Sequence, residues 1–584
     1  MAVANRTRYR RALREERPRP SFTRRRLALA TLMGLAFVSV MASAFYRQIL
    51  ETDFLRHEGE RRFLREREIP ARRGMILDRN GEPLAISTAV ATFTANPRRL
   101  VGNRQAINEL AAALDLDPEQ LNQRVENNRQ RGFMYLRRRV EHHRVDVVRE
   151  ITNRYNLEGI GVETEYRRFY PGGESFAQVI GYTDIDDRGQ EGIELAYDQH
   201  LAPKPGRRRV IQNGRGHIIE EVEQIRPPHH GQDLRLTLDR RLQFFAYREL
   251  KRATLEHQAA AACAVLIDVP TGEILALVNQ PAFNPNASRT ETADQRRNRA
   301  ITDVFEPGST VKPFVVAQAL EAGLIRPETR IDTSPGTMQV GRNRVRDIRN
   351  FGLLDATGVI TKSSNIGVVK IAQQMEKEQL WQMYRNLGFG SRTQIGFPSE
   401  QGGFLSHFSR WSNFEYATLS FGYGLNATAL QLAQAYAVLA REGSYLPATL
   451  VQDQPRVGAR PVFSPSTADT TVKMMETVVS VQGTARRAAI PGYRVAGKTG
   501  TAKKAGPGGY IDGSYQAVFA GIAPLDNPRF VLAVMVDEPG GDHYYGGLVA
   551  APVFAAVMQA ALRLYDVPPD AAQESLFLRA STVQ

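Results

Sequence analysis

Cysteine is almost absent from this sequence. Its 584 residues include one, Cys263, so a disulfide within the chain is excluded. Cys263 lies in the apolar stretch 259–267, which predicts a small buried side chain. The ten histidines include two adjacent pairs, His142-His143 and His229-His230, which lack the i, i+4 spacing of a metal site on a helix. We expect these pairs at the surface, and we expect neither a metal nor a cofactor.

Acidic residues are scarce at one end of the chain. The formal net charge is +14, but residues 1–26 hold ten arginines against only Glu15 and Glu16, which leaves +6 for the other 558 residues. The excess positive charge therefore belongs mostly to one tail. A charge distribution of this kind does not indicate a nucleic-acid-binding protein, and we expect no nucleic-acid partner.

Charge is missing altogether from the next segment. Leu27–Phe45 is an uncharged run of nineteen residues, about the length that crosses the hydrocarbon core of a membrane as a helix. The arginines at 24–26 place the N-terminus in the cytoplasm and the remainder of the chain outside. A cleaved signal peptide is the alternative, because Ala42-Ser43-Ala44 fits the small-residue cleavage pattern. We predict a retained transmembrane helix over 27–46 and a basic cytoplasmic tail over 1–26.

A long apolar run is also lacking in residues 47–232, which are rich in charge and contain arginine-heavy helical pieces and short strands. From Leu234 onward, apolar strands alternate with amphipathic helices. A chain of this length is expected to form two or three domains. We predict a non-catalytic pedestal domain over 47–232, a larger globular domain over 233–567 and a disordered tail over 568–584.

Helices and strands alternate in the larger domain. Asp239 can cap a helix that carries Leu242, Ala246 and Leu250 on one face, and Gly443 can close a second helix that begins near Thr428. Five runs read as strands: 264–268, 273–278, 494–503, 517–522 and 530–536. The sequence therefore predicts an α+β fold, with an antiparallel sheet flanked by helices.

The stretch Phe305–Phe314 contains a candidate nucleophile. Pro307 and Gly308 turn the chain, which places Ser309 at or near a helix N-cap, where its backbone N–H is free to bind an oxyanion. Lys312 follows three residues later on the same helical face, so its amine is expected within hydrogen-bond reach of the Ser309 hydroxyl. A serine nucleophile needs a base in this position.

Lys312 can act as that base only when its amine is neutral, whereas an ordinary lysine has a pKa of about 10.4. Lowering this pKa by about three units takes roughly 4 kcal/mol of burial and like-charge repulsion. A second cation is therefore predicted beside Lys312, and Lys498 is the candidate.

Two further motifs follow the nucleophile. Ser363-Ser364-Asn365 is predicted to lie in a loop before a helix, and Lys498-Thr499-Gly500-Thr501 on the edge of a strand. Ser-x-x-Lys, Ser-x-Asn and Lys-Thr-Gly in this order form the signature set of penicillin-binding proteins and active-site serine β-lactamases. One such motif occurs by chance in many long chains, but the three together are highly specific.

The sequence around the motifs resembles that of the class B penicillin-binding proteins. Within this class it resembles the division-specific D,D-transpeptidases of the FtsI, or penicillin-binding protein 3, type. The resemblance covers most of the chain apart from residues 1–26 and about the last eighteen. It implies the transpeptidase fold shared with serine β-lactamases. The segments that carry it are 73–81, 168–171, 191–194, 305–314, 362–367, 422–425 and 549–554.

The resemblance implies a role for each motif residue. Ser309 would attack the penultimate D-alanine carbonyl of a peptidoglycan stem peptide, Lys312 would accept its proton, and Ser363 would relay a proton to the departing D-alanine. Backbone N–H groups of Ser309 and Thr501 would form the oxyanion hole. The resemblance also implies that Asn365 contacts the acyl amide. In the motif Lys498-Thr499-Gly500-Thr501, the implied contacts with the terminal carboxylate of the substrate come from Lys498, Thr499 and Thr501. Implied contacts with substrate or β-lactam side chains come from Tyr510, Tyr544 and Tyr545.

The resemblance also implies partners and a location. It implies a single-pass protein of the inner membrane with its catalytic domain in the periplasm at the division septum. Implied ligands are peptidoglycan stem peptides and β-lactams. Implied protein partners are a membrane-embedded lipid II polymerase of the FtsW type and other division proteins.

Several alternative functions can be compared with the sequence. The elongation-specific class B enzyme is the main alternative, although the sequence of residues 362–372 favours a division-specific enzyme. A D,D-carboxypeptidase and a β-lactam sensor are weaker ones, and only about twenty-six residues lie on the cytoplasmic side for signalling. A β-lactamase would need a deacylating base, but no Glu-x-x-Leu-Asn lies between Asn365 and Lys498. A bifunctional glycosyltransferase would need Glu-Asp-x-x-Phe-x-x-His, which is absent, and a silent scaffold would be expected to have lost a motif residue.

Overall fold

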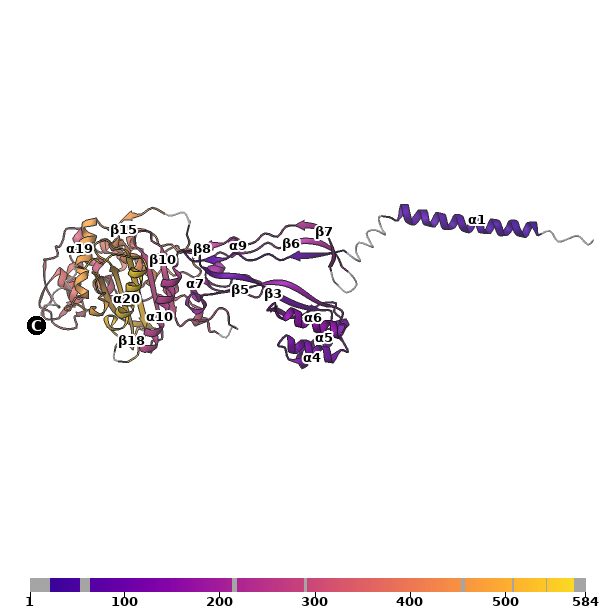
Figure 1. The fold of residues 1–584 in the computed structure, drawn as a ribbon. Helices are drawn as coiled ribbons and strands as arrows, with labels where there is room; N and C mark the ends of the chain where they lie inside the picture. Colours follow the sequence, from indigo (N-terminus) through magenta and orange to yellow (C-terminus); the bar gives the residue numbers. More distant parts are fainter. Residues whose placement is uncertain are drawn as a thin grey trace, which may run out of the picture. The chain divides into compact units, whose positions relative to one another are not determined.

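The computed structural model describes seven stretches of the chain (Figure 1): residues 22–52, 64–212, 218–287, 291–452, 457–506, 509–541 and 543–571. Most of the predicted cytoplasmic tail, residues 1–21, and residues 572–584 of the predicted C-terminal tail lie outside them. The chain forms two compact units, one of residues 1–69 with 207–227 and the other of 70–206 with 228–584. A boundary between pedestal and catalytic domain at 232–233 stays a prediction.

The first unit contains the apolar N-terminal helix and a small sheet. Helix α1 (Thr23–Phe45) continues into a π-helical turn, η1 (Tyr46–Leu50), and its span is long and apolar enough to cross a membrane. None of this span is buried, which fits a single-pass membrane anchor. The sheet has the order β1-β6-β7. Its strands are β1 (Leu64–Ile69), β6 (Gly206–Gln212) and β7 (Ile218–Arg226).

The N-terminal part of the second unit is built around one long strand, β3 (Pro83–Ala95). It pairs with β2 (Ile76–Leu77), β4 (Met134–Val140) and β5 (Ile160–Phe169), and β2 also pairs in parallel with β8 (Leu234–Arg235). Four helices form a small separate core with β3 and β4: α3 (Pro97–Leu100), α4 (Arg104–Ala113), α5 (Pro118–Asn127) and α6 (Arg144–Arg154). Short helices follow: η2 (Gly173–Ser175), α7 (Ala177–Ile180), α8 (Gly192–Ala196) and α9 (Asp198–Leu201).

A buried ion cluster joins distant segments of this region. The Glu194 carboxylate accepts hydrogen bonds from Arg73 Nε at 2.7 Å and from Arg168 Nε at 2.6 Å, and all three side chains are almost completely buried. Arg73 also donates to Asp198 at 2.7 Å. Burying charges is costly unless they are paired, so the three sequence segments are held together by mutual neutralisation. Both predicted histidine pairs lie at the surface.

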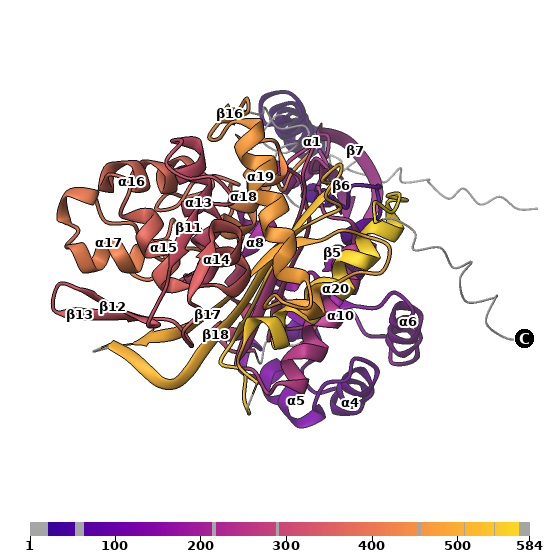
Figure 2. The same cartoon turned by 90° about the vertical axis from the view of Figure 1, so that its left-hand side faces the viewer.

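The larger domain has a five-stranded antiparallel sheet of the predicted kind, in the order β10-β9-β19-β18-β17. Cys263 lies on β9 and is fully buried, as predicted. Helices α10 (Arg240–Glu256) and α20 (Gly546–Leu564) pack together on one face, and α18 (Ala429–Ala440) covers the other (Figure 2). The strands are β9 (Ala261–Asp268), β10 (Ile274–Gln280), β17 (Ala496–Gly506), β18 (Gly509–Ala523) and β19 (Phe530–Asp537). Because β17 is an edge strand, one of its sides is open to a ligand.

Helix caps in this domain follow the sequence. Asp239 caps α10 by accepting from the Arg241 N–H at 3.0 Å, and Thr428 begins α18 with a capping box. The remaining helices are α11 (Ala293–Arg296), α12 (Arg299–Thr302), η3 (Gly308–Val311), α13 (Lys312–Glu321), α14 (Ala356–Lys362), α15 (Asn365–Ala372), α16 (Lys377–Asn386), η4 (Phe408–Arg410), α17 (Asn413–Leu419), α19 (Pro465–Glu476), η5 (Thr477–Val479) and η6 (Arg486–Ala488).

Three small two-stranded sheets complete the domain. They are β11 (Arg330–Asp332) with β14 (Leu353–Asp355), β12 (Thr337–Val340) with β13 (Asn343–Arg346), and β15 (Ser444–Tyr445) with β16 (Arg460–Pro461). The β12–β13 hairpin leads directly to the segment that precedes α14 and α15. It therefore belongs to the surroundings of the Ser-x-Asn motif.

Candidate active site

Ser309 lies on a tight turn rather than at the start of an α-helix. It belongs to the 3₁₀ turn η3, and α13 begins three residues later, at Lys312. The reason is Pro313, which has no N–H to donate to the Ser309 carbonyl. The Lys312 N–H donates to that carbonyl instead, which closes a 3₁₀ ring. Residues three apart eclipse in a 3₁₀ turn, so Ser309 and Lys312 still lie on the same side of the chain.

Lys312 is fully buried and its amine contacts the second motif. Its Nζ donates to Ser363 O at 2.5 Å, to Ser363 Oγ at 3.2 Å and to Asn365 Oδ1 at 2.7 Å. The expected hydrogen bond to the Ser309 hydroxyl is not among the contacts of the described residues. The amine therefore links the nucleophile turn to the Ser-x-Asn motif.

Ser363 and Asn365 lie where two short helices, α14 and α15, meet, whereas the sequence predicts a loop that leads into one helix. Ser363 ends α14 in the left-handed conformation, with φ of 60°, and Ser364 caps α15 by accepting from the Gly367 N–H at 2.9 Å. The Asp347 carboxylate supports this junction. It accepts from Ser364 Oγ at 2.6 Å and from the Asn365 N–H at 2.5 Å. These bonds fix the direction in which the Ser363 and Asn365 side chains project.

The third motif brings a second buried amine to the same hydroxyl group. Lys498, on β17, is fully buried and donates to Ser363 Oγ at 2.9 Å and to its neighbour's carbonyl, Thr499 O, at 3.1 Å. The Ser363 hydroxyl thus lies between the amines of Lys312 and Lys498. The three sequence motifs converge here, although they span almost two hundred residues of the chain.

The two amines have lowered pKa values. Burial, and then repulsion from Lys498, hold the pKa of Lys312 well below the ordinary lysine value, while Asp347 opposes this shift. Burial lowers the pKa of Lys498 to about 7. The second cation expected from the sequence is therefore present, and Lys312 can be a neutral proton acceptor near neutral pH.

Gly500 lets the β17 edge approach the nucleophile turn closely. A Cβ atom on this residue would come within 2.8 Å of the Pro307 carbonyl oxygen. The neighbouring hydroxyls are also fixed: Thr499 Oγ1 lies 2.8 Å from Thr484 Oγ1, and Thr501 Oγ1 accepts from the Gly546 N–H at 3.2 Å. Any side chain at position 500 would push the strand away from Ser309.

Tyrosines gather near the Lys-Thr-Gly strand in two groups. Tyr510 is about half exposed, and its ring meets that of Tyr423 edge-on at a centroid distance of 5.8 Å. Tyr544 stacks on Tyr515 at 4.1 Å and on Tyr545 at 4.5 Å, and Tyr545 directly precedes the first residue of α20. All three tyrosines predicted from the sequence therefore lie in aromatic clusters, whose other members the sequence reasoning had not included.

Glu306 and Asp347 are two site residues that the sequence reasoning missed. Glu306 Oε1 accepts from the Gly424 N–H at 2.9 Å and from the Tyr510 hydroxyl at 3.2 Å, so it ties the nucleophile turn to the tyrosine beside β17. Burial raises the pKa of this carboxyl group. Its position directly before Pro-Gly-Ser could have signalled a role, whereas no spacing rule connects Asp347 with the Ser-x-Asn motif.

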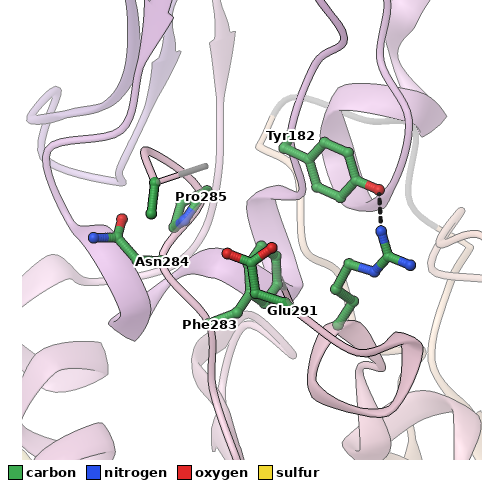
Figure 3. A pocket seen from close by; sticks show the side chains of 7 residues that line it. Tyr182, Phe283, Asn284, Pro285 and Glu291 are labelled. Atoms are coloured by element: carbon green, nitrogen blue, oxygen red, sulfur yellow. Dashed lines mark hydrogen bonds between the residues drawn. The ribbon is translucent and has the colours of Figure 1, made fainter. Parts of the chain in front are cut away.

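A small pocket lies elsewhere in the second unit (Figure 3). It is lined by Tyr182 and Arg296, whose side chains are joined by a hydrogen bond of 2.9 Å, and by Phe283, Asn284, Pro285 and Glu291 among others. None of the motif residues contributes to it. The site to which the sequence motifs point therefore lies between β17 and the junction of α14 and α15.

Comparison with known proteins agrees with this geometry. Residues 262–559 match the family model "Penicillin binding protein transpeptidase domain", and residues 68–236 match "Penicillin-binding Protein dimerisation domain". The chain is 41% identical over 547 residues to the peptidoglycan D,D-transpeptidase FtsI of Escherichia coli K12, covering 92% of this chain and 91% of the relative. It is 39% identical over 549 residues to a probable peptidoglycan D,D-transpeptidase, PbpC, of Pseudomonas aeruginosa, covering 94% and 96%.

A solved structure is similar over most of the chain. The crystal structure of penicillin binding protein 3 from Mycobacterium tuberculosis complexed with aztreonam matches with a TM-score of 0.67 and 30% sequence identity. The match covers 86% of this chain and 98% of the solved one. It includes both the region of the dimerisation domain and the larger domain, so the two-domain arrangement is shared.

Proposed function

The chain belongs to the class B penicillin-binding proteins, and on that basis we propose that it is a serine-type peptidoglycan D,D-transpeptidase that crosslinks stem peptides at the division septum. One observation carries the proposal: the buried amines of Lys312 and Lys498 both donate to Ser363 Oγ, beside the turn that holds Ser309. This arrangement suits a serine nucleophile, a neutral lysine base and a proton relay in one cleft.

The acylation step would begin at Ser309. Its hydroxyl oxygen attacks the penultimate D-alanine carbonyl, and neutral Lys312 accepts the hydroxyl proton. Ser363, which accepts from both amines, then passes its hydroxyl proton to the nitrogen of the departing D-alanine and takes the proton held by Lys312 in its place. The C–N bond breaks and an ester forms at Ser309. Backbone N–H groups of Ser309 and Thr501 would hold the oxyanion, a contribution of about 100- to 1,000-fold in rate for one donor.

The deacylation step would reverse these roles with a second substrate. An amine of a neighbouring stem peptide attacks the ester carbonyl, loses its proton through Ser363 and Lys312, and leaves Ser309 free. Lys498, Thr499 and Thr501 would hold the terminal carboxylate of the donor before acylation, and Asn365 the acyl amide. β-Lactams would be held by the same groups and acylate Ser309.

The location and partners are further parts of the proposal. Helix α1 fits a single-pass anchor in the inner membrane, and the arginines before it would keep the N-terminus in the cytoplasm and the catalytic domain in the periplasm. A lipid II polymerase of the FtsW type and other division proteins would then be the partners. Residues 47–232 would regulate the enzyme, since all three motifs lie between Ser309 and Thr501.

Two experiments test the function. Purified full-length protein is incubated with a stem pentapeptide donor and an amine acceptor, and release of D-alanine together with the crosslinked product is measured; release of D-alanine without crosslinks would indicate a carboxypeptidase. A fluorescent fusion is then imaged in growing cells. Midcell fluorescence supports a division enzyme, whereas fluorescence along the lateral wall would support the elongation-specific alternative.

A further inference from the structure

The β12–β13 hairpin and the loop after it are rich in arginine. Residues 341–350 contain four arginines, Arg342, Arg344, Arg346 and Arg349, and all four are exposed. Within the described part of the chain none of them forms an ion pair, whereas pedestal arginines such as Arg144 do. We name these four arginines the cationic lip.

The one acidic residue of this segment does not neutralise the lip. The Asp347 carboxylate accepts hydrogen bonds from Ser364 Oγ and from the backbone N–H groups of Asn365 and Ile366. Its charge is therefore directed into the N-terminus of α15. The arginine side chains make other contacts: Arg344 Nε donates to Gln339 at 3.1 Å, and the guanidinium of Arg349 lies over the Phe351 ring at 5.2 Å.

The cationic lip begins directly beside the motif residues. Asn365 Nδ2 donates to the carbonyl oxygen of Arg346 at 2.9 Å, while Asn365 Oδ1 accepts from Lys312 Nζ at 2.7 Å. One side chain thus separates the lip from the proposed base. Figure 2 shows the hairpin extending outward from the region of α14 and α15, at whose junction the Ser-x-Asn motif lies. A substrate that lies over Asn365 and extends out of the cleft would pass these arginines.

An exposed apolar side chain lies within the lip. Ile348 is 84% exposed, the highest value among the large apolar side chains of the described residues, and it lies between Arg346 and Arg349 in the sequence. The segment therefore offers an apolar contact flanked by cations. A peptide that alternates alanine methyl groups with carboxylates has the complementary chemistry.

We propose that the cationic lip binds the side-chain and α-carboxylates of a peptidoglycan stem peptide, outside the cleft that holds its D-alanyl-D-alanine end. This inference rests on the proposed function and adds a subsite to it. The carboxylates belong either to the donor, whose acyl group is transferred to Ser309, or to the acceptor, whose amine takes it. Each exposed charge pair contributes little binding free energy by itself, so the proposal relies on several arginines of the lip acting together.

The test compares peptides with and without these carboxylates. Full-length wild type and the Arg342→Gln/Arg344→Gln variant are assayed with stem peptides whose carboxylates are either free or amidated. In each assay, only the donor peptide or only the acceptor peptide is amidated. We expect the variant to lose on the order of fivefold in kcat/KM with free carboxylates and almost nothing with amidated ones. Added salt should reduce the wild-type preference.

Two matched variants separate charge from structure. Arg342→Lys/Arg344→Lys keeps the charge and should retain most of the preference. Arg392→Gln/Arg410→Gln removes two exposed arginines of the same domain that lie outside the lip, and should behave as wild type. Labelling by a fluorescent penicillin should be equal in all variants, because the bonds around Ser363 are unchanged.

The outcomes are distinct. If the variant loses kcat/KM only with donors that have free carboxylates, seen as slower release of D-alanine, the lip binds the donor. If it loses kcat/KM only with acceptors that have free carboxylates, seen as more hydrolysis per crosslink, the lip binds the acceptor. Equal losses with free and amidated peptides, or no loss, would overturn the proposal. Absence of any crosslinking by wild type would instead contradict the proposed function.

Discussion

The amines of Lys312 and Lys498 converge on one oxygen atom, Ser363 Oγ, at 3.2 and 2.9 Å. Both amines are buried, and two positive charges this close repel each other. The site is therefore arranged so that Lys312 gives up its proton easily, while Lys498 is the nearby cation below its pKa of about 7. Activity should depend on pH through this pair.

The acylation rate of the wild type should rise with pH as Lys312 becomes neutral, and fall as Lys498, with a pKa of about 7, loses the charge that attracts the carboxylate. Lys498→Gln removes the repulsion that lowers the pKa of Lys312. That pKa should rise, and the ascending limb of the pH profile should move to higher pH. Penicillin acylation rates across the neutral range measure this shift, and an unchanged limb would contradict it.

Asp347→Asn should move the same limb in the opposite direction, because Asp347 raises the pKa of Lys312. Loss of charged hydrogen bonds to Ser364 and to the start of α15 should also cost about 1–2 kcal/mol in unfolding free energy. Asp355→Asn is the matched control, since Asp355 caps α14 by accepting from Gly358 at 2.6 Å. The control should lose stability without a shift in the pH profile. Equal shifts in both variants would show that Asp347 has no specific effect on the pKa of Lys312.

Glu306 should matter as a hydrogen-bond acceptor and not as a charge. Its carboxyl group accepts from the Gly424 N–H and the Tyr510 hydroxyl, and burial raises its pKa. Glu306→Gln keeps an acceptor and should acylate nearly as wild type, whereas Glu306→Ala should acylate on the order of tenfold more slowly. Tyr510→Phe removes one of the two bonds and should give an intermediate rate of penicillin acylation. A wild-type rate for the alanine variant would rule out this positioning role.

Glu194 should be essential for folding of the second unit. Its carboxylate neutralises Arg73 and Arg168 in a buried cluster, so Glu194→Gln should lower the unfolding free energy by about 3–5 kcal/mol. Glu165→Gln is the control, because the Glu165 pair with Arg138 is partly exposed and should be worth less than about 1 kcal/mol. Chemical denaturation of both variants measures the difference, and similar small losses would show that the cluster is not a stability determinant.

Local patterns were sufficient for much of this protein. The strands of the large sheet, the Asp239 cap and the start of α15 beside Asn365 follow from periodicity and capping rules, and the three motifs predict which residues meet in the site. Capping rules alone do not predict the 3₁₀ turn at Ser309, which forms because Pro313 has no N–H to donate to the Ser309 carbonyl. The contacts of Asp347 and Glu306 depend on tertiary packing between segments up to about two hundred residues apart, which no spacing rule encodes.

The most direct test of the whole account is peptide mapping after labelling with a fluorescent or isotopic penicillin. Full-length wild type should carry one covalent label, on Ser309. Folded Ser309→Ala should carry none, and Lys312→Ala should label far more slowly because the hydroxyl then lacks its base. A label on any other residue, or undiminished labelling of Ser309→Ala, would contradict the assignment of Ser309 as the nucleophile.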